Sequence, residues 1–158
     1  MEYLEISEKD YTAFQRLANV YYREGEDENT PQEEMDGFIR FLFDKVISKE
    51  IDGCFASIGG ECMGFALWAV DTEDFVFSEI PGFGTIMEIG ILLPYRKSGR
   101  GKEFVSYIEA RLRNRGIRQC YVCAYGPAQR FWAQCGYVEN GQTGKNDLPI
   151  MIKQIAEP

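Results

Sequence analysis

The spacing of apolar residues over the first fifty positions predicts a short strand followed by two helices. Residues 3–6 fit the strand, and Ser7 or Asp10 could cap a first helix, whose apolar positions recur at helical spacing at Phe14, Leu17, Ala18 and Tyr21. Thr30 as N-cap and Pro31 at the first helical position predict where a second helix begins. Its apolar positions are Met35, Phe38, Ile39, Leu42, Phe43 and Val46.

From residue 54 onward, apolar runs bounded by glycine turns predict strands. The runs cover residues 54–58, 63–70, 86–93, 117–124 and 148–155. Gly59-Gly60-Glu61 between the first two runs predicts a hairpin, and Gly90 inside the third predicts a bulge. A helix closed by Gly116 fits between the third and fourth runs, and its apolar face carries Phe104, Val105, Ile108 and Leu112. A short helix is expected over residues 127–135.

This order of elements predicts a mixed α/β fold. Two helices come early, a meander of strands follows, and a strand-helix-strand crossover comes near the end. At 158 residues, with 45% hydrophobic and 27% charged positions, the chain fits one globular domain over residues 1–158. No apolar run reaches the roughly 18 residues of a membrane span, and the first residues lack the features of a signal peptide. We therefore expect a cytoplasmic protein without membrane contacts.

Charge is divided unevenly along the chain. Residues 1–90 hold 20 Asp and Glu against 6 Lys and Arg, whereas residues 91–158 hold 5 against 11, within a total net charge of −8. The overall acidity argues against nucleic acid as a partner, because basic residues supply most non-specific affinity for phosphate backbones. The second half favours a small anion, and the acidic first half favours a cation.

Residue types also exclude several kinds of chemistry. The chain has no histidine, so mechanisms that use imidazole as a base, as a nucleophile's partner or as a metal ligand are excluded. Five cysteines in a chain without an export signal indicate reduced thiols. Cys120 and Cys123 lie in a predicted strand, where positions three apart face opposite sides, which argues against a zinc pair. We expect Cys54, Cys62 and Cys135 to fill core space.

A basic, glycine-containing turn follows Pro94. Arg96, Lys97, Arg100 and Lys102 place four positive charges within seven residues, and Gly99 and Gly101 would let the backbone approach a phosphate at the start of the next helix. The alternative is that the glycines only shape a turn and the charges are solvated. The turn lacks both the nucleoside-triphosphate loop pattern and the third glycine of a dinucleotide-binding fingerprint. ATP and NAD are therefore disfavoured as ligands.

Two segments together resemble the GNAT superfamily of N-acetyltransferases. Residues 96–101, Arg-Lys-Ser-Gly-Arg-Gly, match its Gln/Arg-x-x-Gly-x-Gly/Ala signature, with a strand before and a helix after. Residues 128–137, Ala-Gln-Arg-Phe-Trp-Ala-Gln-Cys-Gly-Tyr, resemble its Ala-x-x-Phe-Tyr-x-x-x-Gly-Phe block at the expected distance downstream. The resemblance is sharpest over residues 84–138. It implies a mixed, mostly antiparallel sheet of about six or seven strands, splayed at the cofactor strand and flanked by about four helices.

The resemblance also implies acetyl-CoA as cofactor and suggests which residues hold it. Backbone amides from Lys97 to Lys102 would hold the pyrophosphate, and the backbone of Leu92 and Leu93 would pair with pantetheine. The full implied set is Ile91, Leu92, Leu93, Arg96, Lys97, Ser98, Gly99, Arg100, Gly101, Lys102, Phe131 and Trp132. The loop from Pro94 to the glycines is one residue shorter than in many relatives.

The catalytic candidates follow from the needs of acyl transfer. Glu88, on the strand leading into the turn, is the first candidate for a general base, with a solvent-facing or ion-paired carboxylate as the alternative. An amide near Leu92 could donate to the oxyanion. Many relatives place a tyrosine that protonates the departing thiolate where this chain has Trp132, whose indole does not exchange protons near neutral pH. Tyr125 is the candidate replacement.

The acceptor is an amine of unidentified structure. Its candidate contacts are Glu26, Glu28, Trp68 and Glu79, where Glu79 is also the second candidate base. A solvated acidic loop and ordinary core packing of the aromatic residues are the alternatives for these positions. The leading hypothesis is acetyl transfer to a primary amine in a ternary complex, and the competing one is a CoA-binding module that has lost its chemistry. The sequence leaves open a homodimer.

Overall fold

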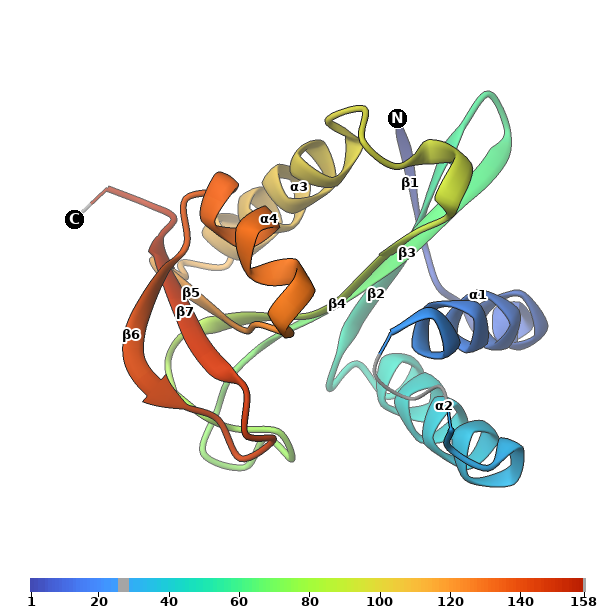
Figure 1. Ribbon diagram of the computed structural model, residues 1–158, viewed down its shortest axis with the longest axis horizontal. Coiled ribbons are helices and arrows are strands. Elements are labelled where there is room, and N and C mark those ends of the chain that lie inside the picture. The colour runs from blue at the N-terminus through green and yellow to red at the C-terminus, as the bar shows by residue number, and fades with distance from the viewer. Residues whose placement is uncertain (26–28, 158) are drawn as a thin grey trace. The chain divides into compact units, whose positions relative to one another are not determined.

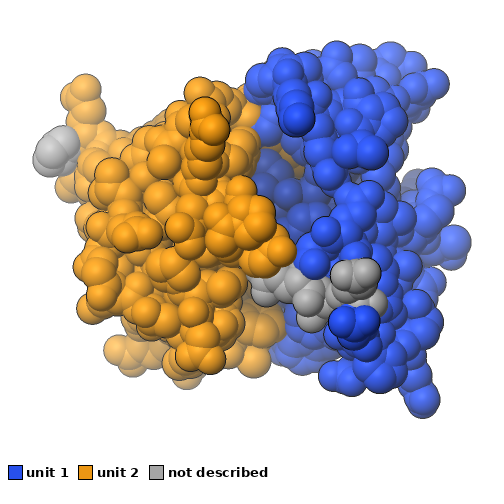
Figure 2. Space-filling model, viewed as in Figure 1, with its two compact units in different colours: residues 1–67, 88–101 blue, residues 68–87, 102–158 orange. Residues whose placement is uncertain are grey.

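The computed structural model describes residues 1–25 and 29–157 (Figure 1). Within these residues, seven strands pair in the order β1-β2-β3-β4-β5-β7-β6, and four α-helices accompany them. The predicted α/β class is therefore confirmed. The contacts divide the chain into two compact units, which Figure 2 colours blue and orange. Unit 1 comprises residues 1–67 and 88–101, and unit 2 comprises residues 68–87 and 102–158.

Unit 1 joins a helix pair to the first part of the sheet. Its elements are β1 (Glu2–Glu5), α1 (Tyr11–Glu24), α2 (Gln32–Ile47), β2 (Asp52–Ile58), most of β3 (Glu61–Val70) and the end of β4 (Gly84–Ile91). β1 pairs antiparallel with β2, and α1 and α2 lie side by side (Figure 1). The predicted apolar faces bury Phe14 and Ile39 completely. Phe38 is an exception, because 38% of it stays exposed at the margin of the helix pair.

Contacts between neighbouring residues mark the starts of the two helices. Both the amide and the hydroxyl of Ser7 donate to the Asp10 carboxylate at 2.8 Å, which closes the turn before α1. The start of α2 differs from the prediction by one residue. Pro31, with extended backbone, takes the cap position in place of Thr30, and the amide of Met35 donates to its carbonyl at 3.0 Å.

The predicted hairpin between β2 and β3 has the expected turn. Gly59 and Gly60 have φ angles of 57° and 84°, both in the left-handed region that a two-residue type I′ turn requires. Further along β3, Gly64 lies where a Cβ atom would stand 2.0 Å from the carbonyl oxygen of Gly90 on β4. The two strands approach so closely here that only glycine fits.

Unit 2 holds the crossover and the last strands. Its elements are the end of β3, the start of β4, nearly all of α3 (Arg100–Asn114), β5 (Gln119–Cys123), α4 (Gln129–Gln134), β6 (Val138–Thr143) and β7 (Pro149–Gln154). β4 and β5 run parallel, whereas β7 pairs antiparallel with both β5 and β6. Gly116, with φ 81°, ends α3 as predicted. The sequence analysis missed β6, because its residues are polar and nearly all exposed.

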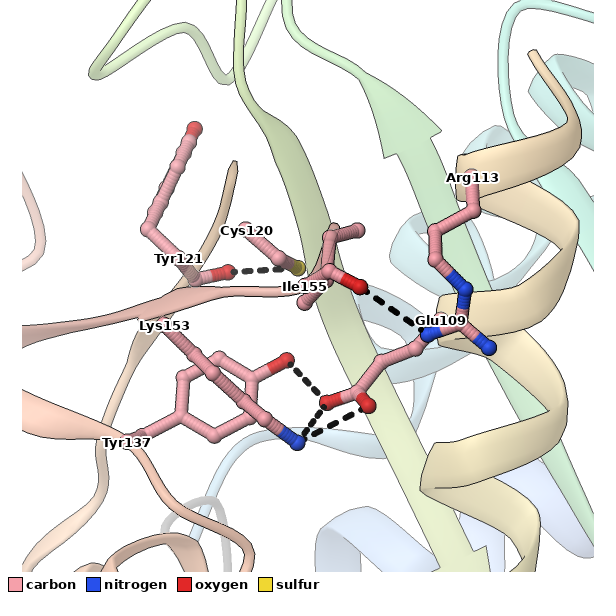
Figure 3. Close-up of polar contacts among 7 residues, drawn as sticks. All are labelled: Glu109, Arg113, Cys120, Tyr121, Tyr137, Lys153 and Ile155. Atoms are coloured by element: carbon pink, nitrogen blue, oxygen red, sulfur yellow. Dashed lines mark hydrogen bonds and ion pairs between the residues drawn. The ribbon is translucent and has the colours of Figure 1, made fainter. Parts of the chain in front are cut away.

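A buried polar cluster lies between α3 and the strands of unit 2 (Figure 3). Glu109 is 4% exposed, and its carboxylate accepts from the Tyr137 hydroxyl at 3.1 Å and from Lys153 Nζ at 2.9 Å on both oxygens. Nearby, Arg113 donates to the carbonyl of Ile155 at 3.1 Å. Burial raises the pKa of Tyr137, so its hydroxyl remains a donor to this carboxylate. The cluster therefore joins the end of the chain to α3.

Candidate active site

The turn predicted to bind an anion contains two residues with left-handed backbone. A single 3₁₀ turn, Leu93–Tyr95, follows β4, and α3 begins at Arg100. Between them Lys97 has φ 61° and Gly99 has φ 79°. The first amides of a helix have no partner within the helix, so those at the start of α3 can donate to a ligand. A Cβ at Gly99 would meet nothing within 4 Å, so the backbone there is open to a ligand.

Side chains from unit 1 hold this turn in place. The Tyr95 hydroxyl donates to Glu61 at 2.8 Å, which raises the pKa of Tyr95. Arg96 donates from Nε to the carbonyl of Ile91 at 2.7 Å and from Nη2 to the carboxylate of Glu24. The charge of Arg96 is thus already matched by a carboxylate. We assign this side chain to holding the turn, which differs from its predicted place at the cofactor.

Glu88, the first candidate base, faces the end of α1. Its side chain is half-buried, and Oε1 accepts from the Tyr22 hydroxyl at 2.9 Å. This contact argues against the alternative of a carboxylate that only faces solvent. The sequence analysis did not identify Tyr22, because it assigned the inward position at the end of the first helix to Tyr21. Tyr22 is in fact the buried member of the pair, at 7% exposure.

The amide of Leu92 is engaged within the protein. It donates to the carbonyl of Met63 at 2.8 Å, and the Leu92 carbonyl accepts from the amide of Tyr95 at 2.9 Å. The Leu92 amide itself is therefore not the open donor that was predicted near this position for an oxyanion. Pairing of the Leu92 and Leu93 backbone with pantetheine stays a prediction. Leu93, one residue further on, is 68% exposed. The predicted bulge at Gly90 stays a prediction.

Two of the aromatic candidates lie in the core of unit 2. Trp132 is 6% exposed and packs edge-on against Tyr137, with ring centroids 5.2 Å apart. Trp68 is 3% exposed and contacts Tyr107 of α3, which contradicts a role in lining an open acceptor site. Tyr125 differs from both. It is 37% exposed at the start of the 3₁₀ turn Gly126–Ala128, which makes it the most exposed of the predicted aromatic site residues.

Glu79 belongs to a tightly bonded loop over residues 71–83. Its carboxylate accepts from the amide of Lys145 at 2.8 Å, and its own amide donates to buried Asp71 at 2.8 Å. Asp71 also accepts from Ile80 and from the Tyr121 hydroxyl. Burial would raise the pKa of Asp71, but these hydrogen bonds outweigh it and lower the pKa. Glu79 therefore has a structural partner, which weakens its candidacy as an acceptor contact or base.

Some predicted features fall outside these contacts. Glu26 and Glu28 lie outside the described residues. All five cysteines are thiols, and burial raises the pKa of Cys120 to about 12 and that of Cys123 to about 11. Cys62 is exposed, so the prediction that it fills core space is wrong. In residues 1–25 and 29–157, no group of three or more metal-ligating side chains is placed to hold an ion, and no helix there is long and apolar enough to cross a membrane.

One family model matches most of the chain, and solved structures of similar fold align with it. The model of the acetyltransferase (GNAT) family matches residues 11–137. A GCN5-related N-acetyltransferase from Ralstonia eutropha aligns with a TM-score of 0.73 at 20% identity, covering 91% of this chain and 96% of that chain. The PaiA N-acetyltransferase from Thermoplasma acidophilum, solved in complex with coenzyme A, aligns at 0.72 and 15% identity, covering 97% and 98%.

A third solved structure of similar fold is named for its acceptor, an aminoglycoside. The aminoglycoside 6'-N-acetyltransferase from Enterococcus faecium aligns with a TM-score of 0.69 at 16% identity, covering 100% of this chain and 99% of that chain. None of the curated proteins compared matches the sequence.

Proposed function

The chain belongs to the acetyltransferase (GNAT) family, and from this membership we propose that it transfers acetyl from acetyl-CoA to a primary amine of a cationic acceptor. Membership makes the protein an acetyltransferase with coenzyme A as its cofactor. The observation that carries the proposal is the turn before α3, where two left-handed residues precede a helix N-terminus in the family's signature position. A single domain, a cytoplasmic location and a homodimer are further parts of the proposal.

The residues of the turn fit the diphosphate of coenzyme A. The backbone at Gly99 is open, and the amides of residues 97–102 precede or begin α3. Lys97, Arg100 and Lys102 supply positive charge, and Arg96 holds the turn through Glu24. Acetyl-CoA, when bound, supplies the thioester whose acyl carbon is transferred. The protein's part is then to grip the anion with main-chain donors and to orient the acceptor.

Two side chains would manage the protons. Glu88 takes a proton from the acceptor's ammonium, directly or through water, which leaves the neutral amine that acyl transfer needs. When the amine nitrogen bonds to the acyl carbon and the bond from that carbon to sulfur breaks, the nitrogen would lose a second proton, which would pass to water. Tyr125 would protonate the departing thiolate, since Trp132 is buried and has only an indole N–H.

Charge and aromatic packing support a cationic acceptor. Residues 1–90 carry 20 acidic against 6 basic residues, and Glu88 lies on the strand face covered by the aromatic end of α1. The rings of Tyr21 and Phe65 meet edge to face there, with centroids 5.5 Å apart. A carboxylate beside aromatic rings attracts an ammonium group through both the ion pair and cation–π contacts. An aminoglycoside, the acceptor in the name of the Enterococcus faecium structure, is one cationic amine of this class.

The proposal is tested first on the cofactor. Calorimetry with acetyl-CoA and with free CoA should show binding to the parent protein, and Gly99→Glu should abolish it, because the variant places a carboxylate where the phosphates are expected and strains a backbone with φ 79°. Gly59→Glu is the matched control, because Gly59 is also left-handed but lies in the β2–β3 turn. No heat with either ligand would overturn the proposal.

Turnover is tested next. Thiol release from acetyl-CoA should be measured with polyamines, aminoglycosides, amino acids and peptides. With an accepted amine, Glu88→Gln and Tyr125→Phe should each lower kcat by about 100-fold, the lower end for a general acid or base. Glu50→Gln, which removes a carboxylate from an ion pair with Lys45, is the control. If both site variants turn over like the parent, the assigned roles are wrong.

A CoA-binding module without turnover is the second candidate. Two observations favour it: Trp132 replaces the family's tyrosine, and the Leu92 amide already donates to Met63. This candidate predicts CoA binding that Gly99→Glu abolishes, together with no acetylation of any amine in the panel. The two functions are thus separated by turnover in a protein shown to bind the cofactor.

A further inference from the structure

We propose that Tyr22 is a positioning residue for Glu88, holding its carboxylate in one orientation toward the acceptor amine. The Tyr22 hydroxyl donates to Glu88 Oε1 at 2.9 Å, and the two residues are 66 positions apart in the chain. Tyr22 is 7% exposed, whereas Glu88 is only half-buried. The catalytic consequence rests on the proposed function, but the contact itself does not.

The packing of α1 fixes where this hydroxyl lies. The ring of Tyr22 meets those of Tyr21 and Phe38 edge to face, at 5.1 and 5.5 Å. Tyr21 in turn lies over β4, because a Cβ at Gly90 would stand 2.9 Å from its ring. Positions 88 and 90 share one face of a strand. The end of α1 therefore covers the face of β4 that carries Glu88, and Tyr22 meets the carboxylate as a result of that docking.

The hydrogen bond would act on Glu88 in two ways. Donation to the charged form stabilises it and so keeps the carboxylate able to accept a proton. It also selects one orientation of a side chain with several rotatable bonds, while a carboxylate has about four acceptor sites and so retains capacity for the amine. Among the described residues, the end of α1 also carries the charged side chains of Arg23 and Glu24. Arg23 donates to the carbonyl of Thr30 at 2.5 Å, and Glu24 pairs with Arg96.

NMR titration of the Glu88 carboxyl carbon tests the contact without any substrate. The resonance is assigned by its loss in Glu88→Gln. Tyr22→Phe keeps the ring and its packing but removes the donor, so the pKa of Glu88 should rise by about one unit, the size expected for one hydrogen bond to a charged group. Tyr11→Phe is the matched control, because Tyr11 begins the same helix and its ring packs on Phe43. An unchanged pKa in Tyr22→Phe overturns the proposal.

Kinetics test the positioning. With an accepted amine, Tyr22→Phe should lower kcat by about tenfold at an almost unchanged KM, and should move the acid limb of the pH profile up by the same unit seen by NMR. A purely structural role would lower Tm and leave that limb where it is, and this result would also overturn the proposal. A parent protein that acetylates no amine overturns the proposed function, while the NMR titration still decides on the contact.

Discussion

Replacing Gly64 by alanine would place a methyl group where the backbone of the neighbouring strand already lies. The new carbon would stand 2.0 Å from the carbonyl oxygen of Gly90 and 3.1 Å from the Cα of Ile91. Carbon and oxygen atoms normally approach to about 3.3 Å at closest. The obstacle is main chain on a paired strand, so β3 and β4 would have to separate by more than about 1 Å. No side-chain rotation can relieve this contact.

We expect this substitution to lower the free energy of unfolding by about 3 kcal/mol, at the upper end for overpacked cores. For a chain of this size, the midpoint of thermal unfolding should fall by about 6–12 °C. Urea denaturation followed by tryptophan fluorescence measures the change. Gly37→Ala is the control, because Gly37 lies in α2 with nothing within 4 Å of the added Cβ. That variant should gain about 0.5–1 kcal/mol. If Gly64→Ala is as stable as the parent, β3 and β4 do not approach each other as closely at Gly64 and Gly90 as they do in this structure.

Three further predictions concern polar groups. Lys153→Met leaves the buried carboxylate of Glu109 without its cation, so urea denaturation should show that the free energy of unfolding falls by about 2–3 kcal/mol. Adding Glu109→Leu removes the unpaired charge and should restore more than half of this loss. If the losses of the two substitutions simply add, an unpaired buried charge is not the cause. Asp71 has a lowered folded-state pKa, so its contribution is present above the unfolded pKa of about 4 and is lost as pH falls through the folded one. Asp71→Asn should therefore cost about 1–2 kcal/mol at pH 7 and flatten the loss of stability as pH falls below about 4, and an unchanged acid limb would refute this. If Arg96 holds the turn through Glu24, Glu24→Gln should weaken CoA binding in calorimetry in the same direction as Arg96→Gln; an unchanged or tighter affinity would place Arg96 on the phosphates.

The features predicted correctly from sequence are those decided by neighbouring residues. Gly59 and Gly60 give the type I′ hairpin because glycine, which has no Cβ atom, adopts left-handed backbone at no steric cost. The first helix was predicted to start at Ser7 or Asp10, and Asp10 is the residue before α1, where it accepts from Ser7 three positions back. The family signature belongs to the same class, since a strand, a glycine turn and a helix start follow one another within a few residues. The fold class and the family were therefore within reach of the sequence.

The errors come from contacts that depend on the tertiary fold. Strand β6 has no apolar alternation to reveal it, because it is an edge strand held by its backbone pairing with β7. Trp68 and Phe38 both stand among apolar residues in the sequence, yet in the structure Trp68 is almost fully buried and Phe38 is 38% exposed. Only the elements packed against each residue decide between these outcomes. A periodic pattern gives the face of a helix or strand but not how completely its neighbours cover it.

In the candidate site, too, residues that depend on their neighbours in sequence differ from residues that depend on distant parts of the chain. The conformation of a glycine-containing turn is a local property, and two residues of the turn predicted from sequence, Lys97 and Gly99, have left-handed backbone. A carboxylate's partner is not local, and the Tyr22 that meets Glu88 comes from 66 positions away. Arg96 shows the limit most clearly, because its position within the signature favoured a phosphate contact, whereas its guanidinium reaches back to Glu24. A positive charge in such a turn can therefore act either on the ligand or on the protein that holds the turn. If Arg96 holds the turn, removing its carboxylate partner weakens CoA binding. If Arg96 contacts the phosphates, removing that partner leaves the affinity unchanged or raises it. The response of CoA affinity to Glu24→Gln therefore separates these two roles.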